Sequence, residues 1–427
     1  MKIFWTLEKP QRKKLLVLFA AGLLFWSSLA SLLPTLPTYV EDVGGTQQQV
    51  GIVMGAFAIG LLLFRPWLGR MADERSRKAV LLLGTAVAAI APLGYLFVHS
   101  IPLLIAIRAF HGISIAAFTT AYSALVVDLS PISQRGELIG YMSLVTPIGV
   151  ALGPAVGGLL QDAAGYTPLF LMAAGLGLLS LVGAAQISEP PIARQTKADN
   201  SSSGADPKSS GRKFWQILGS KPLLIPSVVL LLIGFAFGAL STFVPLFIRE
   251  AKVDLNAGWF YTAAAIASFS MRLFIGRASD RYGRGLFITG SLVCYALAML
   301  MLSVASSANV FLLAGFLEGA GAGTLLPMTI ALISDRSSPQ ERGRVFSLCV
   351  SGFDLGIAIA GPVLGSFAQY LGYRGIFSIS AALAVLAIVI FITQSNKNLS
   401  ASLRFATGRE SDIYALDRDF TNPKSKV

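Results

Sequence analysis

The sequence predicts an all-α membrane protein with twelve transmembrane helices arranged as two pseudo-symmetric six-helix bundles. Three observations lead to this fold class: a strongly apolar composition, apolar runs that recur along the chain, and a charged loop that occurs twice. A run of about 20 apolar residues crosses a hydrocarbon core of about 30 Å as a helix. Helices suit this role because their backbone hydrogen bonds close within each segment.

The composition excludes a soluble protein. Of 427 residues, 54% are hydrophobic and 13% are charged, and the mean hydropathy is +0.68. The net charge of +12 invites a nucleic-acid partner, but the Lys and Arg residues gather in loops between apolar runs, so we expect none. Cys294 and Cys349 both lie inside apolar runs and imply neither a disulfide framework nor a metal site. We expect no cofactor.

The apolar runs predict the helices in order. We expect the first six helices at residues 15–40, 47–68, 79–98, 101–126, 137–161 and 166–188. We expect the second six at residues 222–248, 257–276, 285–305, 308–333, 343–371 and 373–394. The first run is too long for the core of a signal peptide and no small-residue cleavage site closes it, so we retain it as a helix.

Polar segments divide the chain into four parts. An N-terminal bundle at 1–188 and a C-terminal bundle at 222–394 are joined by a cytoplasmic linker at 189–221, which is rich in Pro, Ser and Gly. A cytoplasmic tail follows at 395–427, and its polar, mixed-charge composition predicts disorder.

The two bundles share an internal repeat. The charged segment 69–78 returns as 276–284, and the pairs 69 and 276, 73 and 280, and 77 and 284 each differ by 207. Further residues repeat at the same offset or, late in the fifth helix, at 208: Arg65 with Arg272, Asp128 with Asp335, Arg135 with Arg342, Gly153-Pro154 with Gly361-Pro362, and Gly157 with Gly365. Two parallel six-helix repeats are typical of secondary transporters whose solute site lies between the halves.

The repeated loop resembles the signature loop of the major facilitator superfamily, and this resemblance covers residues 15–394. The segment from Leu36-Pro37 through Arg65-Pro66 resembles the drug:proton antiporter and arabinose-efflux branch of that family. Gly153-Pro154-Ala155-Val156-Gly157-Gly158 resembles the helix-5 motif of antiporters, although the usual upstream glycine is missing. Small residues at this spacing also let helices pack closely, whatever the direction of transport.

The resemblance implies a conformational latch on the cytoplasmic side. Gly69 is expected to pack against the eleventh helix, and Asp73 to join a charge network that holds the outward-facing state. In the first copy of the loop Ser76 replaces the usual glycine. The residues assigned to the latch are Gly69, Asp73, Arg77, Asp128, Arg135, Gly276, Asp280, Arg284, Asp335 and Arg342.

Four ionisable residues within the apolar runs are candidates for proton coupling. Arg108 and His111 lie three residues apart and therefore on one helix face, and Arg108 to Gly112 resembles the helix-4 motif of proton-coupled antiporters. Glu318 is the repeat equivalent of His111 at an offset of 207, and Asp354 lies inside the eleventh helix. Ionisable groups in hydrocarbon are costly and mark ion pathways. A permanent partner, such as a carboxylate bound to Arg108, is the alternative role for each.

The solute is the least determined feature. No Asn or Gln lies at mid-span, which disfavours a site built to bind sugar hydroxyls, whereas aromatic residues are plentiful. An apolar cavity with a few charges suits an amphipathic organic molecule. The aromatic residues assigned to the cavity are Trp26, Phe57, Phe118, Tyr122, Phe235 and Phe243.

These observations favour a monomeric, proton-coupled exporter of an amphipathic organic solute in the inner membrane of a bacterium. Two alternatives remain: a proton-coupled uptake symporter for a sugar or other small metabolite, and a non-transporting membrane sensor. The chain contains no G-x-x-x-x-G-K-[ST], H-E-x-x-H or G-x-S-x-G motif, so an enzyme is not expected.

The distribution of basic residues predicts the topology. Lys and Arg concentrate before the first helix and in the loops that share its side, which places both termini in the cytoplasm. Reporter fusions at Ser202 and at Val427 should therefore both give a cytoplasmic signal. An external signal at either fusion point would contradict the twelve-helix topology.

Overall fold

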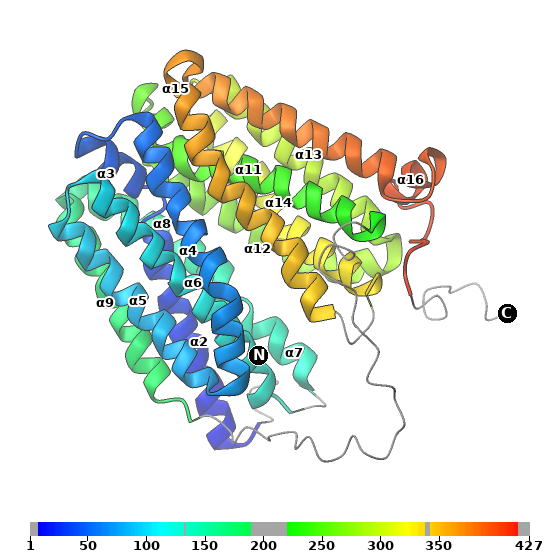
Figure 1. Cartoon of the computed structure of the whole chain (residues 1–427), viewed down its shortest axis with the longest axis horizontal. Helices are drawn as coiled ribbons and strands as arrows, with labels where there is room; N and C mark the ends of the chain where they lie inside the picture. The colour runs from blue at the N-terminus through cyan, green and yellow to red at the C-terminus, as the bar shows by residue number, and fades with distance from the viewer. Residues whose placement is uncertain (1–6, 132–133, 189–219, 338–341, 417–427) are drawn as a thin grey trace.

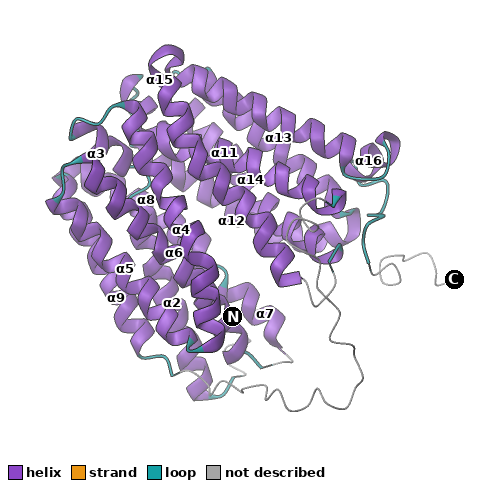
Figure 2. Ribbon diagram, in the orientation of Figure 1, coloured by secondary structure: helices purple, strands orange, loops and turns teal. Residues whose placement is uncertain are grey.

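The structure is a computed structural model that describes residues 7–131, 134–188, 220–337 and 342–416. The described residues form helices and connecting turns, with no strand among them (Figure 2). Ten helical stretches in this part of the chain are long and apolar enough to cross a membrane. These findings confirm the predicted all-α class.

The N-terminal half holds six spans, and two of them are broken. The first span consists of α2 and α3, and the fifth consists of α7 and α8. Pro34 lies in the first break and Pro147 in the first turn of α8, just after the second break, and each proline lacks the backbone N–H that would bond to the carbonyl four residues before it in a continuous helix. The spans predicted at 15–40 and 137–161 are both present, and each is interrupted once. The elements are α2 (Lys9–Ser31), α3 (Leu36–Asp42), α4 (Gln47–Glu74), α5 (Arg77–Phe97), α6 (Ile101–Leu129), α7 (Arg135–Met142), α8 (Val145–Ala164) and α9 (Tyr166–Ala185).

The C-terminal half contains the other four of these stretches, of which the last consists of two helices; with the long helix at 257–282 they make six helices. Its last two are one continuous element, α15, with a non-helical residue at Gly372 where φ is +62°. Only glycine adopts this left-handed conformation without strain, so the chain reverses there, as predicted. The elements are α11 (Lys221–Glu250), α12 (Ala257–Tyr282), α13 (Arg284–Ser303), α14 (Ala308–Asp335), α15 (Arg342–Gln394) and α16 (Leu399–Ala406).

The repeated charged segment is more helical than predicted. Gly69 does not end a helix, because α4 continues to Glu74 and leaves only a short turn before α5. In the second copy α12 continues to Tyr282 and Gly283 makes the turn with φ at +83°. Ser76 stands at the equivalent position in the first copy with φ at −162°, and its hydroxyl accepts a hydrogen bond from the Ala79 N–H at 3.0 Å. A serine cap therefore replaces the glycine turn.

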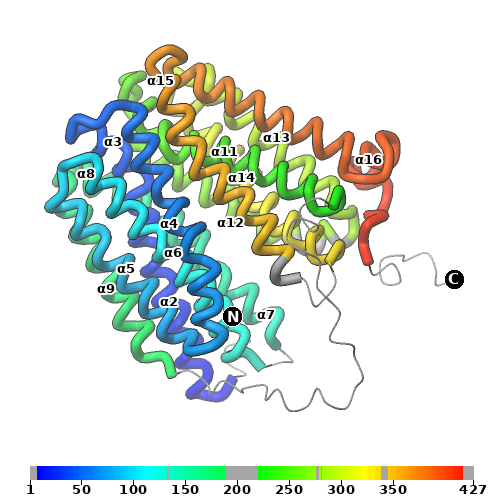
Figure 3. Tube along the Cα trace, in the orientation of Figure 1, coloured from blue at the N-terminus to red at the C-terminus, as the bar shows by residue number. Residues whose placement is uncertain are grey.

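The two halves lie side by side and meet at one end (Figures 1 and 3). We call the end that holds the first residues of α2 and the α4–α5 turn the near side. We call the opposite end, where α3 leads into α4 and Gly372 turns the chain, the far side. Contacts between the halves run mainly along α4 with α15 and along α8 with α12.

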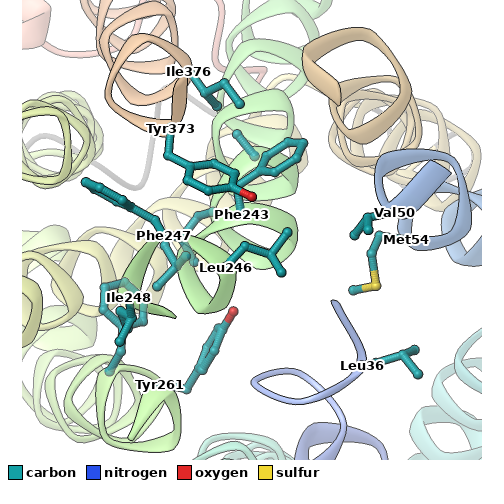
Figure 4. Packing of buried hydrophobic residues seen from close by; sticks show 14 of the residues in the cluster. Leu36, Val50, Met54, Phe243, Leu246, Phe247, Ile248, Tyr261, Tyr373 and Ile376 are labelled. Carbon is teal, nitrogen blue, oxygen red and sulfur yellow. The ribbon is translucent and has the colours of Figure 1, made fainter. Parts of the chain in front are cut away.

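The largest hydrophobic core lies on the far side and includes residues from both halves. Leu36, Val50 and Met54 of the N-terminal half belong to the same cluster as Phe243 and Tyr373 of the C-terminal half (Figure 4). Three further clusters among the described residues lie within single halves. The far side is therefore packed as one body.

The residues after α15 are ordered up to residue 416, so the prediction of disorder is wrong for this part of the tail. Arg336, whose side chain is 1% exposed, binds both carboxylate oxygens of Asp412 at 2.7 and 3.1 Å. The same guanidinium donates to the carbonyl oxygens of Pro222 and Ser395. Arg336 thus ties the tail to the starts or ends of α11, α14 and α15. Residues 417–427 lie outside the described part.

Asp412→Ala should destabilise the fold by about 3 kcal/mol, because it leaves the buried Arg336 charge without its carboxylate. The measurement is the free energy of unfolding in mixed micelles with increasing denaturing detergent. Glu410→Ala is the matched control. Glu410 pairs with Arg404, which is 59% exposed, so this change should cost less than about 1 kcal/mol. Equal losses in the two variants would contradict the structural role of Arg336.

Candidate functional site

Arg108 and His111 lie in a buried cluster in the N-terminal half, on the one face of α6 that their spacing predicted. The Tyr95 hydroxyl lies 3.2 Å from His111 Nδ1, and Arg108 lies close enough for its charge to interact with the same tyrosine. The Arg108 guanidinium lies 4.3 Å from the ring centroid of Phe57. A Cβ on Gly112 would overlap the Phe57 carbonyl, so this glycine allows α6 and α4 to approach. Arg108 Nε and His111 Nε2 have no hydrogen-bond partner among the described residues.

Glu318 lies in a separate cluster in the C-terminal half. It is 3% exposed on α14, where Tyr295 of α13 and Tyr261 of α12 lie close enough to interact with its charge. Glu318 Oε1 has no partner in the described part of the chain. Gly315, Gly319 and Gly323 hold α14 against the backbone of α12. Glu318 is therefore a carboxylate in a packed interior. No described residue forms an ion pair with it.

Asp354 is not an isolated carboxylate. It forms an ion pair with a residue of the other half. Arg65 of α4 donates to Asp354 of α15 at 2.5 Å, and the two side chains are 24% and 12% exposed. From the sequence, Arg65 was identified as part of the repeat and of the family resemblance, but not as a partner of Asp354. The position of an arginine within an apolar run was the signal that could have found it. The four coupling candidates thus occupy three separate places.

The latch residues form pairs within each half rather than across the halves. Arg77 pairs with Asp128, and their repeat equivalents Arg284 and Asp335 pair at 2.8 Å. Asp73 is exposed. A Cβ added to Gly69 would meet no atom within 4 Å, so the expected packing of Gly69 against the eleventh helix is absent in this conformation.

The remaining latch residues add little to this arrangement. Arg135 begins α7, and its Nε has no partner among the described residues. The surroundings of Gly276 and the side chains of Asp280 and Arg342 are not described.

The helix-5 motif is a close-packing site. Cβ atoms at Gly153 and Gly157 would overlap the backbone of α2 at Ser27 and Ser31. Across the halves, Gly158 lies against the Asn256 side chain and the Pro154 carbonyl against Gly258. Both of these contacts between halves are on the far side.

Two equivalent helix crossings close the far side. Gly51 of α4 meets Gly361 of α15, backbone against backbone, and Gly258 of α12 meets Pro154 of α8 in the same way. Positions 51 and 258 differ by 207, and Gly361 is the repeat equivalent of Gly153, the neighbour of Pro154. Glycine allows this close approach because it has no side chain. The far-side contact is thus itself pseudo-symmetric.

A cluster of polar groups joins the halves at the same end. Arg249 of α11 binds Asp42 at 2.6 Å and Glu41 at 3.1 Å, and Tyr166 donates to Asp42 at 2.5 Å. Asp42 and Arg249 differ by 207, so each is the repeat equivalent of the other and their contact lies on the pseudo-two-fold axis. A polar cavity of about 170 Å³ lies beside Arg249 and is lined by residues of both halves.

The predicted aromatic cavity residues separate into two groups. Phe118, Tyr122 and Phe243 are buried among packing partners in this conformation. Phe118 stacks on Phe25 at 3.8 Å between centroids, and the Tyr122 hydroxyl donates to the Met142 carbonyl at 3.0 Å. The partly buried residues are Trp26, Phe57 and Phe235.

Two six-helix repeats with buried ionisable groups at mid-span and a contact restricted to one side define a multi-pass transporter of the alternating-access type. The sequence matches the Major Facilitator Superfamily over residues 18–271 and 251–412, and the chain belongs to this family.

Named relatives match over nearly the whole chain. The chain is 27% identical to the multidrug resistance protein MdtG of Enterobacter lignolyticus, over 95% of this chain and 98% of that protein. It is 24% identical to the staphylopine export protein of Staphylococcus aureus, over 90% and 97% of the two chains. The crystal structure of the nucleoside transporter NupG shares the fold with a TM-score of 0.71 at 16% identity, covering 90% of this chain and 100% of that one.

The axial ion pair predicts a charge-reversal experiment. Asp42→Arg should loosen the far side by placing two arginines together, and Arg249→Asp should do the same with acids. The readout is the rate of maleimide labelling of a cysteine at Val50, with Cys294 and Cys349 replaced by serine. Because the pair is partly exposed, each single change should raise the rate only about two- to fivefold.

The double exchange Asp42→Arg with Arg249→Asp is the matched control, since it restores opposite charges at the same two positions. It should return the labelling rate to that of the parent chain. A double variant that labels as fast as either single variant would show that the ion pair does not hold the far side.

Proposed function

We propose that the chain is a proton-coupled exporter of an amphipathic organic solute that works by alternating access in a bacterial cytoplasmic membrane. The observation that carries this proposal is Glu318, a carboxylate buried near the middle of α14 with two tyrosines and no described cation beside it. A carboxylate without a counter-charge gains from binding a proton in an apolar site. Such a group can carry a proton from one side to the other.

The far-side contacts support alternating access. In this conformation the halves are joined on the far side, while Arg77 and Arg284 bind acids of their own half on the near side. The opposite conformation requires the near-side ends of α4 and α15 to approach each other. Gly69, which has free space around it here, and the exposed Asp73 are available for that contact. With the near side placed in the cytoplasm, the present conformation is inward-facing.

Arg65 and Asp354 suit a different role from Glu318. Their ion pair crosses the halves, so it must break if α4 and α15 separate. Breaking it leaves two charges that need water, a proton or a solute group. The pair therefore resists opening of the far side until another partner is available. Glu318 lies within one half and can bind or lose a proton without this cost.

Our proposals for the solute and for the direction of transport are based on the named relatives and on the helix-5 motif at 153–158. A multidrug resistance protein and a staphylopine export protein are both similar to the chain along nearly its whole length. The Gly-Pro-x-x-Gly-Gly segment, which resembles the helix-5 motif of antiporters, packs α8 against α2 within its own half and against α12 across the halves. We therefore favour export of an organic molecule over uptake.

Glu318→Gln should abolish solute accumulation driven by a pH gradient in proteoliposomes, because the amide cannot bind and release a proton. Solute exchange without net proton movement should continue, since the shape of the site is nearly unchanged. Asp354→Asn is the comparison, and it should alter the balance of conformations while retaining some response to pH.

A Glu318→Gln, Asp354→Asn double variant that still concentrates solute under a pH gradient would overturn the assignment of either carboxylate as the proton carrier. His111 or another coupling ion would then have to supply the driving force. When solute is added outside the vesicles, antiport by the parent chain should move protons out and alkalinise the interior. Acidification of the interior would indicate symport instead, and an unchanged internal pH would indicate uniport.

A further inference from the structure

Arg272 is a largely inward-facing charge to which the proposed transport cycle gives no role. It lies on α12 in register with Tyr261, Ala265 and Ser268, and Tyr261 and Ala265 are buried. Its neighbours Leu273 and Phe274 are exposed and face away from the bundle. Arg272 Nε is buried without a hydrogen-bond partner, and no described residue forms an ion pair with this side chain.

The repeat shows which partner is missing. Arg272 is the equivalent of Arg65, which binds Asp354 across the halves. The N-terminal equivalents of Asp354, at offsets of 208 and 207, are Thr146 and Pro147 of α8, and neither is charged. The crossing of α8 with α12 corresponds to that of α4 with α15, so Arg272 has the environment of Arg65 without its acid.

Neither Glu318 nor Asp162 replaces this partner. Glu318 lies beside Tyr261, which is three turns or about 16 Å from Arg272 along α12. Asp162, the acid on α8, binds Asn256 on the far side at 2.5 Å. Buried arginines are stable when an acid or another acceptor meets them, so an anion is the chemical group that this position lacks.

We propose that Arg272 binds an anionic group of the transported solute, such as a carboxylate, between α12 and α8. This inference rests on the proposed function and narrows its substrate class from amphipathic molecules to amphipathic anions. The guanidinium presents two parallel N–H donors, which match the two oxygens of a carboxylate. The solute would thus provide at the α8–α12 crossing the charge that Asp354 provides at the α4–α15 crossing.

Three dansyl probes with the same apolar body separate the effect of charge: dansyl-aminohexanoate, its primary amide, and the cation dansyl-cadaverine. Binding to the full chain in lipid nanodiscs is measured by thermal stabilisation. The carboxylate should bind about 30-fold or more tightly than the amide, since a buried charge pair loses this much when one partner is removed. Arg272→Gln should reduce binding of the carboxylate to the level of the amide, and Arg272→Lys should keep part of the preference.

Thr146→Asp is the complementary variant. It adds a negative charge on α8 and so gives Arg272 an acidic partner like the one that Arg65 has in Asp354. This variant should lose the preference for the carboxylate while its binding of the amide stays the same. Equal binding of the three probes by the parent chain, or a preference for the carboxylate that survives both Arg272→Gln and Thr146→Asp, would overturn the inference.

Transport in proteoliposomes under an imposed pH gradient tests the proposed function separately. Preferential binding of the carboxylate without any accumulation against its gradient would contradict proton-coupled transport and leave the anion site standing. Accumulation of the amide and the cation as readily as the carboxylate would support the transporter and refute the role of Arg272.

Discussion

Close backbone contact between the two halves at one end of the bundle is the constraint on which the rest of the structure depends. At the Gly51–Gly361 and Gly258–Pro154 crossings even a methyl group would overlap the facing carbonyl. This closeness brings α3 and α11 together at the axial ion pair and unites the far-side core. It also places Arg65 within reach of Asp354 deeper along the same two helices. Separation of the halves on this side must therefore break packing, polar contacts and a partly buried ion pair together.

Each mid-span charge in this interior is placed by what its helix can approach. Gly112 lets α6 lie against α4, so that the Phe57 ring covers the Arg108 guanidinium. The glycines of α14 allow α12 to pack closely against α14, and this packing places Tyr261 of α12 beside Glu318. The result is an uneven distribution of partners: Arg65 has an acid, Arg108 has a tyrosine and an aromatic face, and Glu318 has two tyrosines. Of the three mid-span arginines, Arg272 is the one that lacks such a partner in the described residues.

The sequence predicted the features that depend on local pattern. Apolar runs located the spans, and the offset of 207 aligned the two halves with residues that later proved structurally equivalent, such as Arg77–Asp128 and Arg284–Asp335. It missed features that depend on contacts between distant residues. Arg65 and Asp354 are separated by 289 positions, and no local pattern shows that they meet. The polar composition of the tail predicted disorder, yet the tail is held by the ion pair of Asp412 with the buried Arg336 and by the packing of Phe405 against Phe391.

Local sequence pattern also gave wrong helix ends where a different residue type, such as a serine cap in place of a glycine, makes the turn. The glycine at position 69 suggested the end of a helix, whereas the turn comes later and is made by a serine cap. Proline marked bends correctly but did not show which would interrupt a helix: Pro34 and Pro147 fall at breaks, while Pro66 and Pro154 lie inside continuous helices. The difference is set by packing around each proline, which the sequence alone does not give.

The axial contact between Asp42 and Arg249 bears on the ancestry of the two halves. In a dimer of two identical six-helix proteins the same residue would occupy this place twice, and two acids or two arginines on the axis would repel each other. The salt bridge can form only when the two copies carry different residues, which requires that they be encoded separately. The pair therefore records divergence after duplication, and it makes each half a specific partner for the other rather than for a copy of itself.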